Sequence, residues 1–357
     1  MVKTKKFCIL ILKGEKMKII KNKRQVLWFD YKVKKRSFVT ILTSLFLFIY
    51  TSTSFALELR IGHFAPVGHP ITQGTTEAAK TIKKLSGGDI VLKVFPANQL
   101  GKNKDLVQQV SDGSLDFTID GPGMIGNWHK PVAVFEAPFL ADSWSEMKKI
   151  VNSQKAQSMF KELENKASLK VISNPWNGSS RNFTTTKKAI KTPEDLKGLK
   201  IRVPKVPHFM DMIKACEGVP SPMAFAEVYM ALQTGVVDGQ ENPITTINAG
   251  KFQEVQKHIS MTGHITTAFL VLSNSKKWES LSQNQKDIII KGFNAGAKVN
   301  DKAVNEAEKK LLKEFKASGM TVTKPDKDAF KKKMVVVYKN KEADWGKGIV
   351  QALRSGL

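Results

Sequence analysis

Strand-like and helix-like segments alternate along most of this chain, and the alternation limits the folds that it can adopt. Residues 57–65 and 89–96 have the apolar pattern of strands, and residues 71–88 between them have helical spacing that ends in two glycines. Long helices are predicted over 143–167 and from about residue 283 to 318. Strands that alternate with helices predict α/β sheets with helices on both faces.

Length and composition are consistent with two domains. A chain of 357 residues with 41% hydrophobic and 25% charged residues is long enough for two cores and has the composition of a soluble globular protein. No internal repeat or low-complexity linker marks a boundary, and we expect the chain to cross between two lobes more than once. The predicted discontinuous domains are domain I, 57–179 with 268–307, and domain II, 180–267 with 308–357.

The first 56 residues differ from the rest and predict export. A basic cluster at 34–36 precedes an apolar run, 38–50, and small residues up to Ala56, which is the pattern of a secretory signal peptide. The apolar core is short for a membrane-anchoring helix, so we predict cleavage after Ala56 and a periplasmic location. Residues 1–32 form an upstream extension, and we hypothesise that translation starts near Val33.

Charge and cysteine content argue against several classes of protein. Removal of the first 56 residues leaves 44 Lys and Arg against 30 Asp and Glu, which lowers the net charge from +25 to +14. The lysines are scattered and not interleaved with aromatic residues, so we expect a solvated surface and no nucleic-acid partner. Cys216 is then the single cysteine, typical of a small buried side chain. The sequence predicts a monomer with no metal site and no cofactor.

Arginine is rare in this chain, with six residues against 51 lysines, and four arginines follow Ala56. A solvated surface position accepts lysine in place of arginine, so the positions that keep arginine are enriched for those that need its planar five-donor fork. Arg60 and Arg354 have ordinary surroundings in the first strand and the C-terminal tail. Arg181 and Arg202 lie 21 residues apart around one compact unit.

That unit begins with a buried strand, LKVIS, that we expect to end in a Pro/Asn/Gly turn within NPWNGSSR, residues 174–181. In TPEDLKG, residues 192–198, Thr192 is the predicted N-cap of a single helical turn closed by glycine. The strand LKIRVP then places Arg202 on the face opposite its apolar residues. Two arginines on adjacent extended segments can converge on one anion. Periodicity alone leaves a purely structural role open.

Motifs for enzymatic chemistry are absent from the sequence, which contains no HExxH, GxSxG, Walker loop or GxGxxG. The glycine-rich stretch at 120–128 follows a predicted strand, and we expect it to form either backbone N–H groups that face a cleft or a simple turn. His63 and His69 flank a Pro-Gly loop, where helix capping is favoured over metal ligation. Aromatic residues that could line a pocket, although such residues belong to a core more often, are Trp128, Trp176 and Phe225.

Several stretches together resemble the solute receptors of tripartite ATP-independent periplasmic (TRAP) transporters, the dicarboxylate-receptor family. They are VFPANQLG, SLDFT, APFL, NGSSRNFTTTKKAIKTPEDLKGLKIRVP and PSPMAFAEVYMALQTGVVDGQENP, and the similarity covers about residues 57–350. The resemblance implies a two-lobed α/β periplasmic binding protein, with discontinuous domains and crossing segments, that closes over its ligand.

The resemblance also implies a ligand site. In that family the arginine of the GLKIRVP strand, here Arg202, forms a salt bridge with the ligand carboxylate, and the arginine of the NGxR turn, here Arg181, supports the same anion. The asparagine of GQENP, Asn242, hydrogen-bonds the carboxylate, and the aromatic residue of PMAF, Phe225, packs over the ligand. The predicted ligand-binding residues are Arg202, Arg181, Asn242, Phe225, Phe64, Asp120 and Trp176.

Four positions depart from the sialic-acid receptors of the family. Those receptors carry Asn, Asp, Glu and Arg where this chain has Phe64, Asn103, Gly121 and Met124. A polyhydroxylated sugar acid would lose polar partners there, and buried unmatched hydroxyls cost about 1–3 kcal/mol each. Sialic acid is therefore disfavoured, and we expect a smaller or less polar acid: a C4-dicarboxylate, a 2-oxo or hydroxy acid, or an aromatic carboxylate.

The resemblance implies a receptor that catalyses no reaction and delivers an organic-acid anion to the membrane subunits of a TRAP transporter. Two alternatives stay open at this point. One is an enzyme acting on organic acids, with Glu136, Asp120 or Glu241 as its general base. The other is a ligand-sensing periplasmic module.

Overall fold

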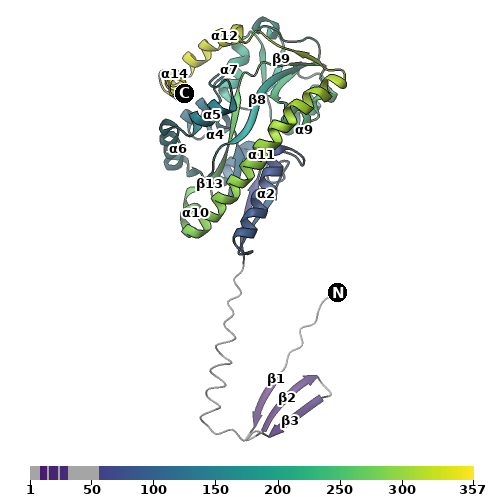
Figure 1. Cartoon of the computed structure of the whole chain (residues 1–357), viewed down its shortest axis with the longest axis vertical. Coiled ribbons are helices and arrows are strands. Elements are labelled where there is room, and N and C mark those ends of the chain that lie inside the picture. The colour runs from purple at the N-terminus through teal and green to yellow at the C-terminus, as the bar shows by residue number, and fades with distance from the viewer. Residues whose placement is uncertain (1–8, 14–15, 23–24, 31–55) are drawn as a thin grey trace. The chain divides into compact units, whose positions relative to one another are not determined.

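The computed structural model describes residues 9–13, 16–22, 25–30 and 56–357 (Figure 1). The chain divides into two units, residues 1–55 and 56–357. In the first unit, an antiparallel three-stranded sheet is formed by β1 (Ile9–Lys13), β2 (Lys16–Asn22) and β3 (Gln25–Asp30). The predicted signal peptide and the proposed start near Val33 lie outside the described residues, apart from Ala56. No helix in the described part of the chain is long and apolar enough to cross a membrane.

The second unit is a mixed α/β structure, which confirms the fold class predicted from the alternating pattern. Its strands are β4 (Leu57–Gly62), β5 (Ile90–Phe95), β6 (Phe117–Asp120), β7 (Leu169–Val171), β8 (Trp176–Thr185), β9 (Lys200–Val203), β10 (Val219–Pro222), β11 (Gly239–Pro243), β12 (His258–Ser260), β13 (Thr266–Asn274) and β14 (Thr321–Thr323).

Helices cover this sheet and connect its strands (Figure 1). The α-helices are α2 (Pro70–Leu85), α3 (Asn103–Ser111), α4 (Pro122–Ile125), α5 (Trp144–Val151), α6 (Gln154–Ala167), α7 (Pro207–Ala215), α8 (Val228–Gln233), α9 (Ile244–Ala249), α10 (Ser275–Ser280), α11 (Gln283–Ala317), α12 (Lys327–Asn340), α13 (Glu342–Trp345) and α14 (Ile349–Ser355). Short 3-10 helices are η1 (Lys130–Glu136), η2 (Pro193–Leu196), η3 (Phe225–Glu227) and η4 (Phe252–Glu254).

Two long strands join the halves of the sheet. Its main path is β10-β9-β11-β8-β13-β6-β4-β5, in which β8 pairs with both β11 and β13. Both strands are irregular where β8 pairs with β13. Ser179 in β8 has a positive φ of 65°, and the β8–β13 register shifts between Thr266 and Ala268. The chain thus crosses between the two halves more than once, as expected for a two-lobed fold.

The long helix α11 packs along α2 (Figure 1). A Cβ atom at Gly74 of α2 would lie 2.4 Å from the Trp176 ring and 2.7 Å from the carbonyl oxygen of Gly296 in α11. Glycine is therefore required for this close approach. Trp176 is fully buried at the contact, so its large apolar surface stabilises the packing of the two helices against β8.

Local capping explains where the structure follows the sequence pattern and where it differs. The turn at η2 is confirmed, and the Asp195 carboxylate accepts a hydrogen bond from the N–H of the N-cap residue Thr192 at 2.9 Å. The helix predicted over 143–167 is wrong, because the Ser153 hydroxyl accepts a hydrogen bond from the Ala156 N–H at 3.2 Å and begins a second helix, α6. The predicted turn after the LKVIS strand is shorter than expected, since residues 172–175 separate β7 from β8 and residues 176–181 belong to β8, which bends at Ser179.

Candidate functional site

A cleft of about 960 Å³, its open mouth included, lies among the ends of several strands. Six of the seven predicted ligand-binding residues line it: Arg202, Arg181, Asn242, Phe225, Phe64 and Asp120. The four positions that depart from sialic-acid receptors also line it: Phe64, Asn103, Gly121 and Met124. Trp176 does not line the cleft and lies instead in the contact between α2 and α11. The Trp176 ring is part of the hydrophobic core.

Arg202 is a buried cation whose only hydrogen-bond partner in the described structure is neutral. It comes from β9 and is 3% exposed. Its Nε and Nη2 donate to the carbonyl oxygen of Met223 at 3.2 and 2.7 Å, which leaves three of its five N–H groups for the cleft. Burial lowers the pKa of Arg202 to about 9, so the side chain is still charged at neutral pH.

Arg181 has a different environment, because the protein already supplies its counter-ion. Its Nε and Nη2 donate to the carboxylate of Glu241 at 2.5 and 2.8 Å, and the guanidinium lies 5.0 Å from the ring centroid of Phe209. Burial alone would raise the pKa of Glu241, but the Arg181 charge and the hydrogen bonds hold it below its usual value. The two charges form a bidentate buried pair.

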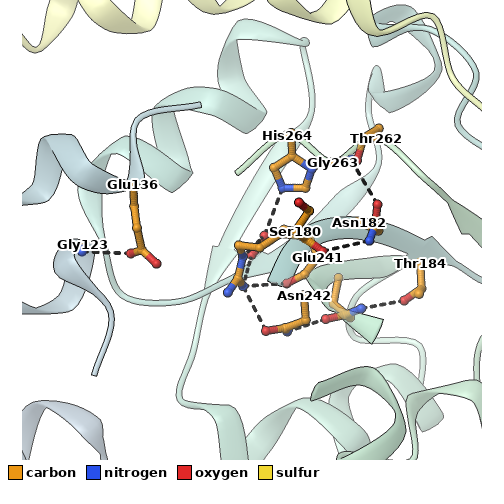
Figure 2. A network of polar contacts seen from close by, with 12 residues as sticks. Gly123, Glu136, Ser180, Asn182, Thr184, Glu241, Asn242, Thr262, Gly263 and His264 are labelled. Atoms are coloured by element: carbon orange, nitrogen blue, oxygen red, sulfur yellow. Dashed lines mark hydrogen bonds and ion pairs between the residues drawn. The ribbon is translucent and has the colours of Figure 1, made fainter. Parts of the chain in front are cut away.

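A histidine and an asparagine extend this pair into a network (Figure 2). The Nε2 of His264 lies 3.1 Å from Glu241 Oε2, and its Nδ1 lies 2.7 Å from the Thr262 hydroxyl. Burial lowers the pKa of His264, so a neutral ring that donates to Glu241 and accepts from Thr262 satisfies both contacts. Arg181 Nη2 also donates to Asn242 Oδ1 at 3.0 Å.

Asn242 is oriented by these contacts. Its amide oxygen accepts from Arg181, and its Nδ2 donates to Gln240 Oε1 at 2.6 Å. One N–H of the amide group is left for the cleft. The contact with Arg181 thus fixes the orientation of the Asn242 amide group at the cleft, and the Arg181 charge is paired with Glu241.

Two buried carboxylates belong to the same cleft. Asp120, at the end of β6, accepts from Asn103 Nδ2 and from the Gly121 N–H, both at 2.8 Å. Glu136 accepts from the Gly123 N–H at 2.8 Å (Figure 2). Burial raises the pKa of Asp120 to about 7 and also raises the pKa of Glu136.

The backbone of the glycine-rich stretch therefore has a different role from the one considered in the sequence. The N–H groups of Gly121 and Gly123 are not available to a ligand, because they donate hydrogen bonds to the carboxylates of Asp120 and Glu136. A Cβ at Gly123 would lie 2.5 Å from Glu136 Oε2. The absence of a side chain at Gly121 and Gly123 thus allows the Glu136 carboxylate to approach the backbone at the cleft.

Aromatic rings and an ion pair complete the cleft. Phe64 packs edge-on against Phe225, with ring centroids 5.6 Å apart, and lies 5.8 Å from Phe269. At the solvent-exposed mouth, Lys102 Nζ lies 2.6 Å from Glu227 Oε1 and joins the segment before α3 to η3. The apolar rings can cover carbon atoms of a ligand while its polar groups contact the buried charges.

Sequence reasoning missed the partners of the predicted residues. Glu241 and Glu136 were considered only as bases, and His264 and Asn103 were given no binding role. His69 does cap a helix, as expected, since its Nδ1 accepts from the Ile71 N–H at 3.1 Å. Within the described residues no group of three His, Cys, Asp or Glu side chains could hold a metal ion.

Comparison with known proteins identifies the family. The sequence profile of the bacterial extracellular solute-binding proteins, family 7 (DctP), matches residues 61–344. The chain belongs to this family. It is 34% identical to the sialic acid-binding periplasmic protein SiaP of Vibrio cholerae over 85% of this chain and 94% of that protein. It is 31% identical to the 2,3-diketo-L-gulonate-binding periplasmic protein YiaO of Escherichia coli, over 78% of this chain and 85% of that protein.

Solved structures of DctP proteins have the same fold. A TRAP periplasmic solute-binding protein from Sulfitobacter sp. NAS-14.1, with bound β-D-galacturonate, matches with a TM-score of 0.79 and 29% identity over 84% of this chain and 98% of that one. A second one, from Actinobacillus succinogenes with bound L-galactonate, matches with a TM-score of 0.80 and 28% identity over the same shares. These matches confirm the two-lobed fold and the TRAP receptor family. The relatives named are binding proteins and not enzymes.

Proposed function

We propose that this DctP protein is a periplasmic receptor that captures a small organic-acid anion through a salt bridge with Arg202 and delivers it to the membrane subunits of a TRAP transporter. The observation that carries the proposal is the environment of Arg202. The guanidinium is 3% exposed and has no carboxylate partner among the described residues. A buried cation without a counter-ion is unfavourable, and a ligand carboxylate would satisfy it with bidentate hydrogen bonds.

The other residues of the cleft support the same role. Asn242 has an N–H group that can contact the same carboxylate, and the Phe64 and Phe225 rings can pack on the ligand's carbon atoms. The acids named for the relatives are consistent with an anion: sialic acid, 2,3-diketo-L-gulonate, galacturonate and galactonate. The proposal includes the acid classes predicted from the sequence, which are C4-dicarboxylates, 2-oxo or hydroxy acids, and aromatic carboxylates.

We also propose that the lobes are residues 57–179 with 268–307, and 180–267 with 308–357. The irregular backbone at Ser179 and the register shift between Thr266 and Ala268 support these boundaries, because both lie where the chain would pass between the lobes. Closure of the lobes would exclude water and strengthen the contact between Arg202 and the carboxylate.

The test of the function is the affinity of Arg202 variants for an acid that binds the wild-type chain. Acids that co-purify with the protein are first identified by mass spectrometry. Arg202→Lys is expected to lower the affinity for the acid at least about 30-fold, since lysine cannot make the bidentate contact. Calorimetry measures the affinity, and the exposed Lys298→Ala change serves as a control. Near-equal affinities of Arg202→Lys and the wild type would refute the proposed role.

A further inference from the structure

Residues on the two sides of the cleft mouth meet through an ion pair. Lys102 Nζ lies 2.6 Å from Glu227 Oε1, and the two residues are 125 positions apart in the chain. Lys102 lines the cleft, and so do residues 223–225, which shortly precede Glu227. In the lobes proposed above, Lys102 belongs to the first lobe and Glu227 to the second. The pair therefore connects the two lobes across the mouth.

Both partners are oriented by hydrogen bonds within their own segments. Glu227 Oε2 accepts from the Ala224 N–H at 3.3 Å, and the other carboxylate oxygen, Oε1, accepts from Lys102. The N–H of Lys102 donates to Asp105 Oδ2 at 3.2 Å, at the start of α3. Ordering of two flexible side chains is a main cost of an exposed ion pair. The local contact of the Glu227 carboxylate lowers that cost here.

Two buried contacts join the same two lobes within the cleft. Phe64 packs against Phe225, with ring centroids 5.6 Å apart. His69 Nε2 lies 3.2 Å from the Thr246 hydroxyl, and burial lowers the pKa of His69 to about 3, so its ring is neutral at neutral pH. The ion pair at the mouth differs, because its side chains are charged and 55% and 45% exposed. Of the three contacts, it is the one that dissolved salt weakens.

Other ion pairs between the proposed lobes lie outside the cleft. Lys130 is paired with Asp344 at 2.8 Å, and Lys331 is paired with Asp142 at 3.0 Å. None of these four residues lines the cleft, and both pairs involve the C-terminal helices. Position therefore distinguishes the pair at the mouth, because the two sides of the mouth must separate before a bound molecule can leave.

We propose that Lys102 and Glu227 form a latch, an ion pair that forms when the lobes close over a bound acid and breaks when they open, so that retention of the acid depends on ionic strength. This role rests on the proposed function, because it takes the closed cleft as the bound state. A contact present only in the bound state contributes its full free energy to the affinity. For an ion pair of this exposure, the expected gain in affinity is about two- to fivefold at low salt.

The experiment is a calorimetric double-mutant cycle on the full chain with Lys102→Gln, Glu227→Gln and the double variant. The titrants are D-galacturonate, L-galactonate, sialic acid and the acid that mass spectrometry identifies in the purified protein. Each is titrated at about 20 mM and about 500 mM NaCl, concentrations that leave exposed charges weakly and strongly screened. The cycle removes the separate effect of each charge on the attraction of an anion.

The matched control is the cycle at Glu58 and Lys93. This pair has nearly the same geometry and exposure, with 2.7 Å between Lys93 Nζ and Glu58 Oε2 and side chains that are 49% and 51% exposed. It joins the neighbouring strands β4 and β5 within one proposed lobe, so closure does not change it. The control variants are Lys93→Gln, Glu58→Gln and the two together.

We expect Lys102→Gln to weaken binding by a factor that is about two- to fivefold larger when Glu227 is present than when it is glutamine, at low salt. This coupling factor should approach one at high salt. The control cycle should show a coupling factor near one for affinity at both salt concentrations.

Three results would overturn the latch while the proposed function stands. They are a coupling factor near one at low salt, a factor that salt does not reduce, and an equal factor in the control cycle. In each case binding would still depend on Arg202. If no acid binds, or if Arg202→Lys binds as tightly as the wild type, the proposed function itself fails and the latch fails with it.

Discussion

Two kinds of buried charge lie in this DctP protein, and they differ in whether the protein compensates them. Arg181 is paired with Glu241 at 2.5 Å and held in a network with His264 and Asn242 (Figure 2). Arg202 and Asp120 line the same cleft without an oppositely charged side chain at hydrogen-bonding distance in the described structure. The compensated pair stabilises the site, whereas the uncompensated charges lower stability and are available to a ligand.

The largest effect is expected from breaking the compensated pair. Glu241→Gln leaves Arg181 buried without its counter-ion, so the free energy of unfolding should fall by about 3 kcal/mol. Chemical denaturation measures the change. Glu58→Gln removes a surface partner of Lys93, where both side chains are about half exposed, and should cost less than about 1 kcal/mol. Equal costs for the two variants would show that burial does not distinguish the pairs.

A stability change of intermediate size, and of opposite sign to that of Glu241→Gln, is expected for substitution of Asp120. Burial raises its pKa from 3.8 to about 7, so between about pH 4 and 7 the folded chain holds a proton that the unfolded chain has lost. Stability therefore falls as the pH rises through this window. Asp120→Asn should stabilise the ligand-free chain by on the order of 2 kcal/mol above pH 7 and by nothing below about pH 4. Thermal unfolding at several pH values measures this, and a pH-independent difference would contradict it.

The smallest of the three effects is expected at Arg202 in the absence of ligand. Arg202→Met replaces an uncompensated buried cation with an apolar side chain of similar length and should stabilise the chain by about 1 kcal/mol. The gain is limited because the Met223 carbonyl loses two donors. Denaturation of ligand-free protein measures it. A loss of several kcal/mol would instead assign Arg202 a structural role like that of Arg181.

Much of the fold and part of the site could be predicted from the sequence. The strand at β9, the capped turn at Thr192 and the long helix α11 follow from local patterns of apolar spacing and capping residues. The break between α5 and α6 was missed because one serine decides it, and Trp176 was assigned to the ligand because an aromatic residue has the same appearance in a core and in a pocket.

The partner of Arg181 could not be predicted in the same way. Arg181 and Glu241 are 60 residues apart and meet because β8 pairs with β11 in an antiparallel register that sets Pro243 opposite Arg181. A shift of one residue in that register would turn the Glu241 side chain to the other face of the sheet. The residues next to Arg181 in the sequence do not determine this register, so it could not be predicted from them.

By itself the sequence determined the α/β alternation. It also indicated that Arg202 is a candidate binding residue, because arginine is rare in this lysine-rich chain. Both depend on residue type and short-range spacing. Only the tertiary structure decided which buried charges are compensated, and so which of them are available to a ligand. Compensation depends on distance and burial, and strands distant in sequence establish these only when the chain is folded.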